Sequence, residues 1–370
     1  MSELSRRRFL QGSGYGVLAG AILPGALARG QEAAPSSKKV GFALVGLGRL
    51  AINQLLPAFA TCQHARVAAL VSGHPDKAKD LAGKFGVDEK SIYNYENFDS
   101  IKDNPDVDVV YIVLPNSMHA EYTVRAAKAG KHVLCEKPMA NTVEECQQMI
   151  DAVKAAKKKL MIAYRLHYEP FNQKAIAICR EKTYGPVKLI HAEFGFNIPG
   201  GTWRTDKKLA GGGPLPDVGV YCINATRYLA GEEPVQVSAT LHQPNDDERF
   251  KDVEESAAWW MRFPGGALAH CATTYGASLG GRYRFSTRDA QVIVDPSFNY
   301  HGLKMTIINR GKAEPVDLPD IDQFAAEMDH FADCVQRDKP PLTPGEEGLA
   351  DVKVMKAIYQ SAQSSNAVSL

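Results

Sequence analysis

The stretch that decides the fold runs from Val40 to Ala51 and reads VGFALVGLGRLA. Its first six residues form a short, continuous apolar run, which is typical of a strand buried on both faces of a parallel sheet. Gly46 then permits a tight turn, and Gly48 lets the backbone approach a pyrophosphate. Ala51 takes the third slot of the glycine pattern, where a small side chain allows the next helix to pack closely. This order of strand, turn and helix predicts a dinucleotide site at the helix N-terminus; a purely structural glycine turn is the competing interpretation.

Strands and helices alternate from there to about residue 164. Apolar runs predict further strands at 67–71, 109–113, 132–135 and 160–163. Helices are expected between them at 52–62, 77–85, 119–129 and 143–156. Repeated strand–helix units of this length indicate a parallel, doubly wound sheet. We therefore assign residues 39–164 to a Rossmann-type domain that binds NAD(P).

The pattern changes after about residue 164. A helix is expected at 171–180, followed by strand-like runs at 187–196, 235–241, 257–263, 268–274, 291–294 and 303–309. Glycine, proline, asparagine and aspartate turn signals separate these runs, which predicts a mostly antiparallel sheet. A last helical segment near 345–364 is a candidate for packing back on the first domain. Residues 165–370 are thus assigned to a second domain of α+β type, and the fold class as a whole is α/β.

The composition is that of an ordinary globular protein with two domains. The chain has 370 residues, 45% of them hydrophobic, and so exceeds the size that one hydrophobic core usually serves. Lys and Arg (43) nearly balance Asp and Glu (42), and the formal net charge is +1. This balance argues against a nucleic-acid partner. The seven cysteines show neither a disulfide framework nor the spacing of a metal site, so no metal is expected.

Residues 1–28 are expected to be an export signal. Residues 5–11 read SRRRFLQ and precede a weakly apolar, glycine-rich stretch, which is typical of a twin-arginine signal. Cleavage after Ala28 leaves a short polar arm at 29–38 and a periplasmic protein without a membrane anchor. That route carries folded proteins, which suits an enzyme that acquires a cytoplasmic nucleotide. An amphipathic start helix or a membrane anchor is the competing interpretation, but the apolar run is short and interrupted by glycines.

The end of the second predicted strand bears on which nucleotide is bound. NAD enzymes usually place a carboxylate there to bind the ribose 2′-hydroxyl, but this chain has Ser72-Gly73-His74. Without an acid to repel it, a 2′-phosphate would be held by the Ser72 hydroxyl and backbone amides, by Lys77 and by Arg49. These residues favour NADP over NAD. Lys77 and Arg49, taken singly, are also consistent with plain solvated charges.

Two further segments carry candidate catalytic groups. Lys137 comes just after a predicted strand, near the carboxyl edge of the sheet where ligands of such folds bind. There it would reach a nicotinamide ribose and a substrate hydroxyl, although spacing alone also fits a surface lysine; Glu136 would pair with a neighbouring cation. A glycine run at 211–213 then leads into a segment with Asp217 and Tyr221 four residues apart. Both side chains lie on one face if that segment is helical.

Alcohol oxidation requires a set of this kind. The hydroxyl proton must be removed while a hydride leaves the same carbon, so a base must lie beside that oxygen, and Tyr221 is the candidate. A phenol titrates near pKa ~10, so it needs a positive neighbour at neutral pH, which Lys137 would supply. Asp217 would orient Lys137 or bind sugar hydroxyls. Spacing leaves other roles open, a helix cap for Asp217 and a packed aromatic for Tyr221.

Six short motifs together resemble the glucose-fructose oxidoreductase and inositol dehydrogenase family. They are GLG at 46–48, LPNSMH at 114–119, EKP at 136–138, YRLHY at 164–168, LAGGG at 209–213 and DVGVYCIN at 217–224. The resemblance covers nearly the whole chain, from the export signal to residue 348. A homo-dimer or homo-tetramer is expected.

The resemblance implies roles for individual positions. Lys137, Asp217 and Tyr221 would be catalytic, and they would share the sugar substrate with His167, Trp203 and Arg204. Many dehydrogenases of the family have histidine at the position of Tyr221, so tyrosine there points to the glucose-fructose branch. NADP would be contacted by Gly46, Leu47, Gly48, Arg49, Leu50, Ser72, Gly73, Lys77, Leu114, Pro115, Asn116, His119, Glu136, Lys137 and Arg165.

The expected reaction is oxidation of an aldose at C1 to its lactone, with NADP as the hydride acceptor and a second sugar as a candidate oxidant of the NADPH. The arm at 29–38 is shorter than the arm that covers the cofactor in glucose-fructose oxidoreductase, so permanent retention of NADP is left open. Two alternatives also stay open. An exported glycoside hydrolase would use retained NAD for transient oxidation and elimination, and a non-catalytic protein would only bind sugar or cofactor.

Overall fold

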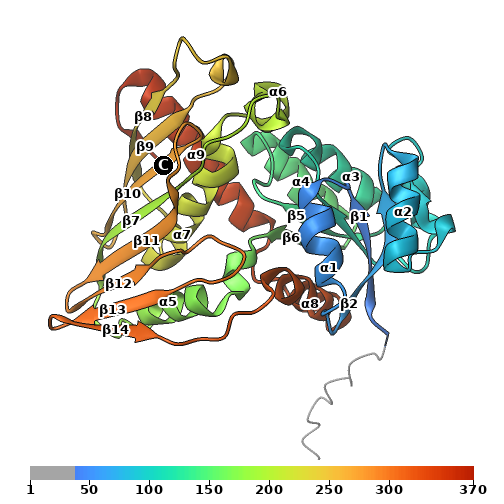
Figure 1. Ribbon diagram of the computed structural model, residues 1–370, viewed down its shortest axis with the longest axis horizontal. Coiled ribbons are helices and arrows are strands. Elements are labelled where there is room, and N and C mark those ends of the chain that lie inside the picture. The colour runs from blue at the N-terminus through green and yellow to red at the C-terminus, as the bar shows by residue number, and fades with distance from the viewer. Residues whose placement is uncertain (1–37) are drawn as a thin grey trace, which may run out of the picture. The chain divides into compact units, whose positions relative to one another are not determined.

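The computed structural model describes residues 38–370. The predicted signal at 1–28 and all of the predicted arm except Lys38 lie outside the described residues. All of the described residues belong to one compact unit of the chain. The described residues of this unit form a pair of β-sheets, which are built from successive halves of the sequence (Figure 1).

The first sheet has six parallel strands in the order β3-β2-β1-β4-β5-β6. Its strands are β1 (Val40–Val45), β2 (Ala65–Val71), β3 (Ile92–Tyr93), β4 (Val109–Ile112), β5 (His132–Glu136) and β6 (Leu160–Ala163). Every residue of β1, β4 and β6 is buried, as expected for a parallel sheet covered on both faces. The predicted Rossmann arrangement is confirmed.

The helices of this half are α1 (Leu56–Ala58), α2 (Pro75–Phe85), α3 (His119–Lys128) and α4 (Val143–Ala155). The helix expected at 52–62 is shorter than predicted. It starts as a π-helical turn, η1 (Ala51–Leu55), in which the Leu56 N–H donates to the carbonyl of Ala51. Pro57 follows and has no N–H with which to continue the usual ladder, and the α-helical part ends at Ala58.

The second sheet has nine strands in the order β14-β13-β12-β11-β7-β10-β9-β8-β15. Only the β7–β10 pair is parallel among the described strands of this sheet, so the predicted mostly antiparallel sheet is confirmed. The strands are β7 (Val187–Gly195), β8 (Gln236–His242), β9 (Ser256–Arg262), β10 (Leu268–Thr274), β11 (Gly280–Thr287), β12 (Ala290–Val294), β13 (Met305–Asn309), β14 (Lys312–Val316) and β15 (Val368–Ser369).

One face of this sheet packs against helices and the other carries the exposed side chains. In β11, Tyr283 and Phe285 are buried, whereas Arg282 and Arg284, which alternate with them, are exposed. The buried face receives α7 (Val220–Ala230) and α9 (Gly345–Ser364), and α5 (Pro170–Arg180) packs against α7 (Figure 1). On the opposite face, Trp260 is 50% exposed.

Two helices from the second half of the chain return to the first sheet. The last helix, α9, packs against α4 and β6, as the sequence suggested. A second helix, α8 (Gln323–Gln336), was not expected; its Phe324, Met328 and Phe331 join the same core cluster as β1. The Asp329 carboxylate of α8 also accepts hydrogen bonds from three backbone N–H groups, those of residues 63, 64 and 65, and so holds the start of β2.

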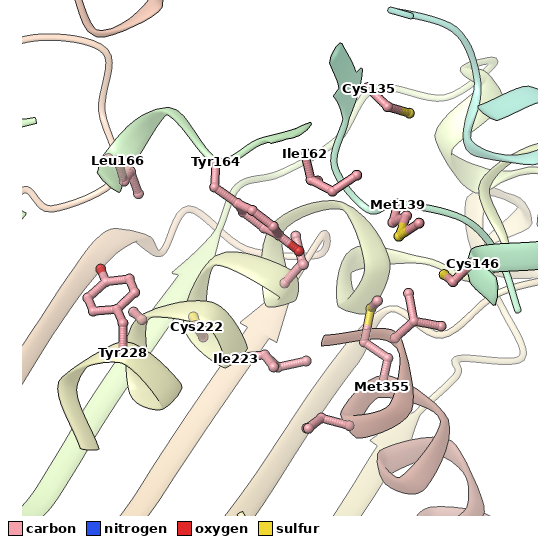
Figure 2. Packing of buried hydrophobic residues seen from close by; sticks show 14 of the residues in the cluster. Cys135, Met139, Cys146, Ile162, Tyr164, Leu166, Cys222, Ile223, Tyr228 and Met355 are labelled. Carbon is pink, nitrogen blue, oxygen red and sulfur yellow. The ribbon is translucent and has the colours of Figure 1, made fainter. Parts of the chain in front are cut away.

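A continuous core therefore joins the two halves. Figure 2 shows side chains from the edge of the first sheet (Cys135, Ile162) together with side chains from α7 (Ile223) and α9 (Met355), and they belong to one buried cluster. Gly348 of α9 lies so close to the first domain that a Cβ there would come within 2.8 Å of the Met139 Cβ. The relative position of the two sheets is thus set by packing.

Four strands were not predicted from the sequence: β3, β11, β14 and β15. The β11 sequence GGRYRFST has the alternation of a half-buried strand, but it opens with two glycines, which normally weaken a strand. Within residues 38–370, no helix is both long and apolar enough to cross a membrane.

Candidate active site

The glycine loop after β1 has the geometry that a dinucleotide site requires. Gly46 has φ +96°, and a Cβ there would lie 2.4 Å from the carbonyl oxygen of Val113, so this position tolerates glycine alone. A Cβ on exposed Gly48 would meet nothing within 4 Å. Leu47 is buried and Leu50 half-buried, both with the core cluster that contains β1, so the loop offers mainly its backbone to a ligand.

The residues expected at the 2′-position of the nucleotide lie beside this loop. The Lys77 ammonium donates to the backbone carbonyl of Leu47 over 3.4 Å. Ser72 is buried, and its hydroxyl oxygen accepts a hydrogen bond from the N–H of His74 (3.1 Å). Gly73 lies against the Tyr95 ring, and a Cβ at this position would lie 3.1 Å from the nearest ring carbon. The Arg49 residue next to the loop is exposed.

The segment after β4 contains His119, whose ring lies inside the protein. His119 is fully buried, and its ring nitrogens each lie 2.9 Å from a backbone carbonyl, one of Leu114 and one of Pro138. Burial lowers the pKa of His119 in spite of those carbonyls. The His119 ring thus holds together the loops after β4 and β5, and its expected contact with the cofactor stays a prediction.

Asn116 and Glu136 also direct their side chains into the protein. The Asn116 amide donates to the carbonyl of Ala210 over 2.8 Å. The Glu136 carboxylate accepts a hydrogen bond from the Tyr111 hydroxyl (2.9 Å), and burial raises the pKa of Glu136. Both groups are thus engaged with the protein, and Glu136 pairs with a phenol rather than with the expected cation.

Lys137, Asp217 and Tyr221 come together at the carboxyl end of the parallel sheet. The Lys137 side chain, only 11% exposed, donates from its ammonium to the backbone carbonyl of Asp217 over 2.7 Å. The same nitrogen lies 3.4 Å from the Asp217 carboxylate and 4.6 Å from the centre of the Tyr221 ring. The three predicted catalytic residues therefore form one cluster, although 80 residues separate the lysine from the aspartate.

The glycine run at 211–213 explains how the two segments approach each other. Added Cβ atoms would collide with the Asn141 amide at Gly211, with the Tyr359 hydroxyl at Gly212 and with the backbone of Glu254 at position 213. Three consecutive residues without side chains thus let this segment pass through a crowded region. It then enters a π-helical turn, η7 (Leu215–Gly219), and continues into α7, so Asp217 and Tyr221 project into the same site.

The Asp217 carboxylate is held from three directions. Besides Lys137, its Oδ2 atom accepts hydrogen bonds from Arg204 Nε (2.9 Å) and from the Tyr275 hydroxyl. Burial alone would raise the pKa of Asp217, but the lysine and the arginine outweigh it and lower the pKa to about 2. Asp217 is therefore a fixed anion, and it makes the lysine contact that the sequence analysis considered.

Tyr221 is surrounded by cations and aromatic rings. Arg165 Nη2 donates to the Tyr221 hydroxyl over 3.4 Å, so an arginine that was not expected there contacts this oxygen. Lys137 lies over the face of the ring, where a cation is attracted by the π system. The rings of Phe194 and Phe298 pack on Tyr221 at centroid distances of 5.4 and 5.7 Å.

Arg165 is itself fixed by three further groups. Its guanidinium donates to the Gln323 side chain on α8 and to the backbone carbonyls of Phe298 and Asn299. Arg165 thus joins Tyr221 to α8 and to the loop at 298–299, and its predicted cofactor contact stays a prediction. Burial and the charges of Tyr221, Asp217 and Glu136 act in opposite directions on Lys137, and the net effect raises the pKa of Lys137.

Of the predicted substrate residues, Trp203 and Arg204 lie near the surface and His167 lies inside the protein. Trp203 and Arg204 lie in a short turn, η6 (Trp203–Thr205), where Arg204 is 37% exposed and stacks over the Trp203 ring at 4.8 Å. His167 is buried, and its Nε2 atom lies 2.9 Å from the amide oxygen of Asn224. His167 thus supports a residue of α7, and its expected contact with the substrate stays a prediction.

Tyr275, Gln323 and Phe298 were not found from the sequence. Each touches a predicted site residue across 58 or more positions of the chain, and none belongs to a motif. Tyr275 follows a strand that was predicted, but nothing in its neighbourhood indicates that its hydroxyl reaches Asp217. Among residues 38–370, no cluster of three or more His, Cys, Asp or Glu side chains is arranged to hold a metal ion.

The fold and the site together define a class. A parallel sheet with an open glycine loop at the start of its first helix, and a partly buried Lys–Asp–Tyr cluster at the same edge, fits a dinucleotide-dependent oxidoreductase. The residues present fit such a cofactor, because Gly48 leaves open space where a phosphate would approach.

Comparison with known proteins agrees with this class. Residues 40–164 match the family described as "Oxidoreductase family, NAD-binding Rossmann fold" and residues 172–294 match the "GFO/IDH/MocA C-terminal domain". The chain belongs to the GFO/IDH/MocA oxidoreductase family, which confirms the resemblance found in its motifs.

Two of the similar proteins are named for their action on sugars. D-xylose 1-dehydrogenase [NADP(+)] of Haloarcula marismortui is 32% identical over 347 residues, which cover 92% of this chain and 96% of that protein. The crystal structure of aldose-aldose oxidoreductase from Caulobacter crescentus, complexed with glycerol, matches with a TM-score of 0.88 at 44% identity over 90% of this chain and 100% of that one. The crystal structure of a 3-ketoreductase from Actinomadura kijaniata in complex with NADP and TDP-benzene has a TM-score of 0.78 at 26% identity. The match covers 88% of this chain and 98% of that one.

The glycine loop generates a prediction about dinucleotide binding. We expect Gly48→Val to weaken binding at least about tenfold, because its side chain would fill the space in which a pyrophosphate approaches. The urea midpoint of unfolding should change little, since nothing lies within 4 Å of the new Cβ. Fluorescence titration with the nucleotide measures the first effect.

Gly46→Ala is the matched control in the same loop. Its Cβ would collide with the Val113 carbonyl at a residue of positive φ, so it should lower the urea midpoint before nucleotide is added. Unchanged nucleotide affinity in the Gly48 variant would contradict the assignment of the loop.

Proposed function

We propose that this protein is an exported, NADP-dependent oxidoreductase that oxidises an aldose at C1 to its lactone. One observation carries the proposal: a buried lysine, a fixed aspartate and a tyrosine between cations meet at the edge of a dinucleotide-binding sheet. The family supplies the class of reaction. The names of the two relatives, a D-xylose 1-dehydrogenase and an aldose-aldose oxidoreductase, support an aldose as the substrate.

NADP is proposed as the cofactor on two grounds. No carboxylate follows β2, and Ser72, Lys77 and Arg49 lie beside the glycine loop where a 2′-phosphate would need partners. The Haloarcula relative is named as an NADP(+) enzyme, and the Actinomadura structure contains NADP. When bound, NADP supplies the acceptor for the hydride that leaves the sugar carbon.

The side chains of the cluster provide the proton chemistry. The C1 hydroxyl of the sugar gives its proton to the phenol oxygen of Tyr221 as the C1–H bond breaks and the C=O bond of the lactone forms. Arg165 beside that oxygen and Lys137 over the ring stabilise the negative charge that the oxygen carries before it accepts the proton. Asp217 holds Lys137 in place, and Arg204 beside it is exposed enough to reach a sugar hydroxyl.

A second sugar is the proposed oxidant of the NADPH formed. The support is the 44% identity to an enzyme named for transfer between two aldoses. In that cycle the same Tyr221 oxygen returns its proton to the carbonyl oxygen of the second sugar as an alcohol forms. The cluster therefore ends each cycle in its starting protonation state.

The first test is removal of the reacting oxygen. We expect Tyr221→Phe to lower turnover of aldoses at least about a thousandfold, because the proton then has no acceptor, while nucleotide affinity stays within about twofold. Absorbance at 340 nm and chromatography of the sugar products measure turnover across an aldose panel.

Tyr300→Phe provides a control in the same neighbourhood. Tyr300 stacks on Arg165 at 4.7 Å and has no role in the proposed proton transfer, so this variant should remain active. Substantial activity of the Tyr221 variant would overturn the proposal. Release of a glycosyl leaving group without a net change at 340 nm would favour the hydrolase alternative.

The choice of cofactor is tested by the two cations near the loop. We expect Arg49→Ala and Lys77→Ala to weaken NADP binding about tenfold or more and NAD binding far less, because a charged partner of the 2′-phosphate is lost. Calorimetric titration with both nucleotides gives the ratio. Lys79→Ala, on the same helix, is the control. An equal loss for NAD and NADP would contradict the assignment.

Export is tested through the twin arginines at the start of the chain. Replacing Arg6 and Arg7 together by lysine should leave the protein in the cytoplasmic fraction, because the signal is read through this pair. Cell fractionation followed by immunoblotting measures the distribution. Arg29→Lys, placed after the proposed cleavage point, should be exported normally. Normal export of the double variant would contradict the proposal.

A further inference from the structure

Tyr275 is enclosed and makes hydrogen bonds through both its backbone and its side chain. It follows β10 directly, is fully buried, and packs with Ile198 and Val218 in a small separate cluster. Its backbone N–H donates to the carbonyl of Glu255 (2.9 Å), and its own carbonyl accepts from the N–H of Ile198 (2.9 Å). The ring therefore has one place to lie, and from there its hydroxyl donates to Asp217 Oδ2.

We propose that Tyr275 is a positioning residue of sugar oxidation. Its hydroxyl fixes the Asp217 carboxylate, and Asp217 in turn holds Lys137 against the Tyr221 ring. This inference rests on the proposed function. Tyr275 touches Asp217 and no reacting atom, so it acts through the aspartate.

Arg204 does not make Tyr275 redundant, although both donate to the same oxygen. Arg204 lies in a three-residue turn and is 37% exposed, so its guanidinium is free to exchange the carboxylate for a sugar hydroxyl. The Tyr275 hydroxyl is enclosed, so a sugar hydroxyl does not reach it to replace Asp217 as its partner. It is the partner of Asp217 Oδ2 that stays in place whether sugar is bound or not.

The charges around this contact determine how it responds to pH. Lys137, Arg204 and Tyr275 face Asp217, with Tyr221 across the lysine, while Arg204 and the buried Glu254 face Tyr275 together with Asp217. Burial, followed by the charge of Asp217, raises the pKa of Tyr275, so this phenol keeps its proton and remains a donor. Donation to the ionised carboxylate favours the charged form, and loss of the donor makes Asp217 easier to protonate.

Tyr275→Phe tests the proposal, since it removes only the hydroxyl. We expect kcat to fall about tenfold, as for loss of one hydrogen bond to a charged group, with nucleotide affinity unchanged. The acidic limb of the kcat profile should move to higher pH, because Asp217 without this donor becomes protonated at a higher pH than in the wild-type protein. Carbon-13 NMR of labelled aspartate should show the Asp217 signal, identified by its absence in Asp217→Asn, titrating at higher pH in Tyr275→Phe.

Tyr283→Phe is the matched control. Tyr283 is also a fully buried tyrosine, on β11 in the same sheet, and its hydroxyl donates to the Asn172 side chain over 3.0 Å. Its removal should destabilise the fold comparably and leave kcat and the acidic limb unchanged. An equal fall of kcat in both variants would show a structural effect only and overturn the inference.

A double-mutant cycle separates this inference from the proposed function. In the Asp217→Asn background, Tyr275→Phe should lower residual activity by less than about twofold, because its target charge is gone. A full tenfold loss there would overturn the positioning role. If the wild-type protein oxidises no aldose, the proposed function fails, yet the NMR titration still decides whether Tyr275 controls Asp217.

Discussion

The contact between Lys137 and Asp217 is the interaction on which the rest of the site depends. One ammonium group reaches both the backbone carbonyl and the carboxylate of the aspartate, and so joins the end of β5 to the start of η7. Buried charges are tolerated only when they are paired and hydrogen-bonded, and removal of either partner leaves an uncompensated charge in the interior. The second domain must therefore approach the first closely enough to bring this pair together, and much of the surrounding structure serves that approach.

Packing between the two halves supplies the required precision. The glycines at 211–213 remove three side chains where the chain passes Asn141, Glu254 and Tyr359, and α8 and α9 return from the second half to cover the first sheet. Because protein interiors are close-packed, these contacts leave little freedom for the sheets to shift relative to each other. The charge pair is thus held by apolar packing that surrounds it, and not by its own attraction alone.

Two phenols meet the same cluster and differ in their surroundings. Tyr221 is half-buried, with Arg165 at its hydroxyl and Lys137 over its ring, so two cations lie beside this phenol. Tyr275 is enclosed, and its hydroxyl faces a carboxylate, which favours the protonated form. Identical side chains therefore lie in opposite surroundings, one beside two cations and the other beside an anion.

The sequence by itself determined the class of the fold, the position of the dinucleotide loop and, through its motifs, the three residues of the cluster. These signals are local: a strand, a glycine turn and a helix follow one another within about a dozen residues, and their periodicity reports burial directly. Only the tertiary structure decided that His119 and His167 face the interior, that Arg165 is the cation at the Tyr221 oxygen, and that Tyr275 holds Asp217. Those facts depend on contacts between segments that are distant in the chain, and such contacts leave no periodic or compositional trace in one sequence.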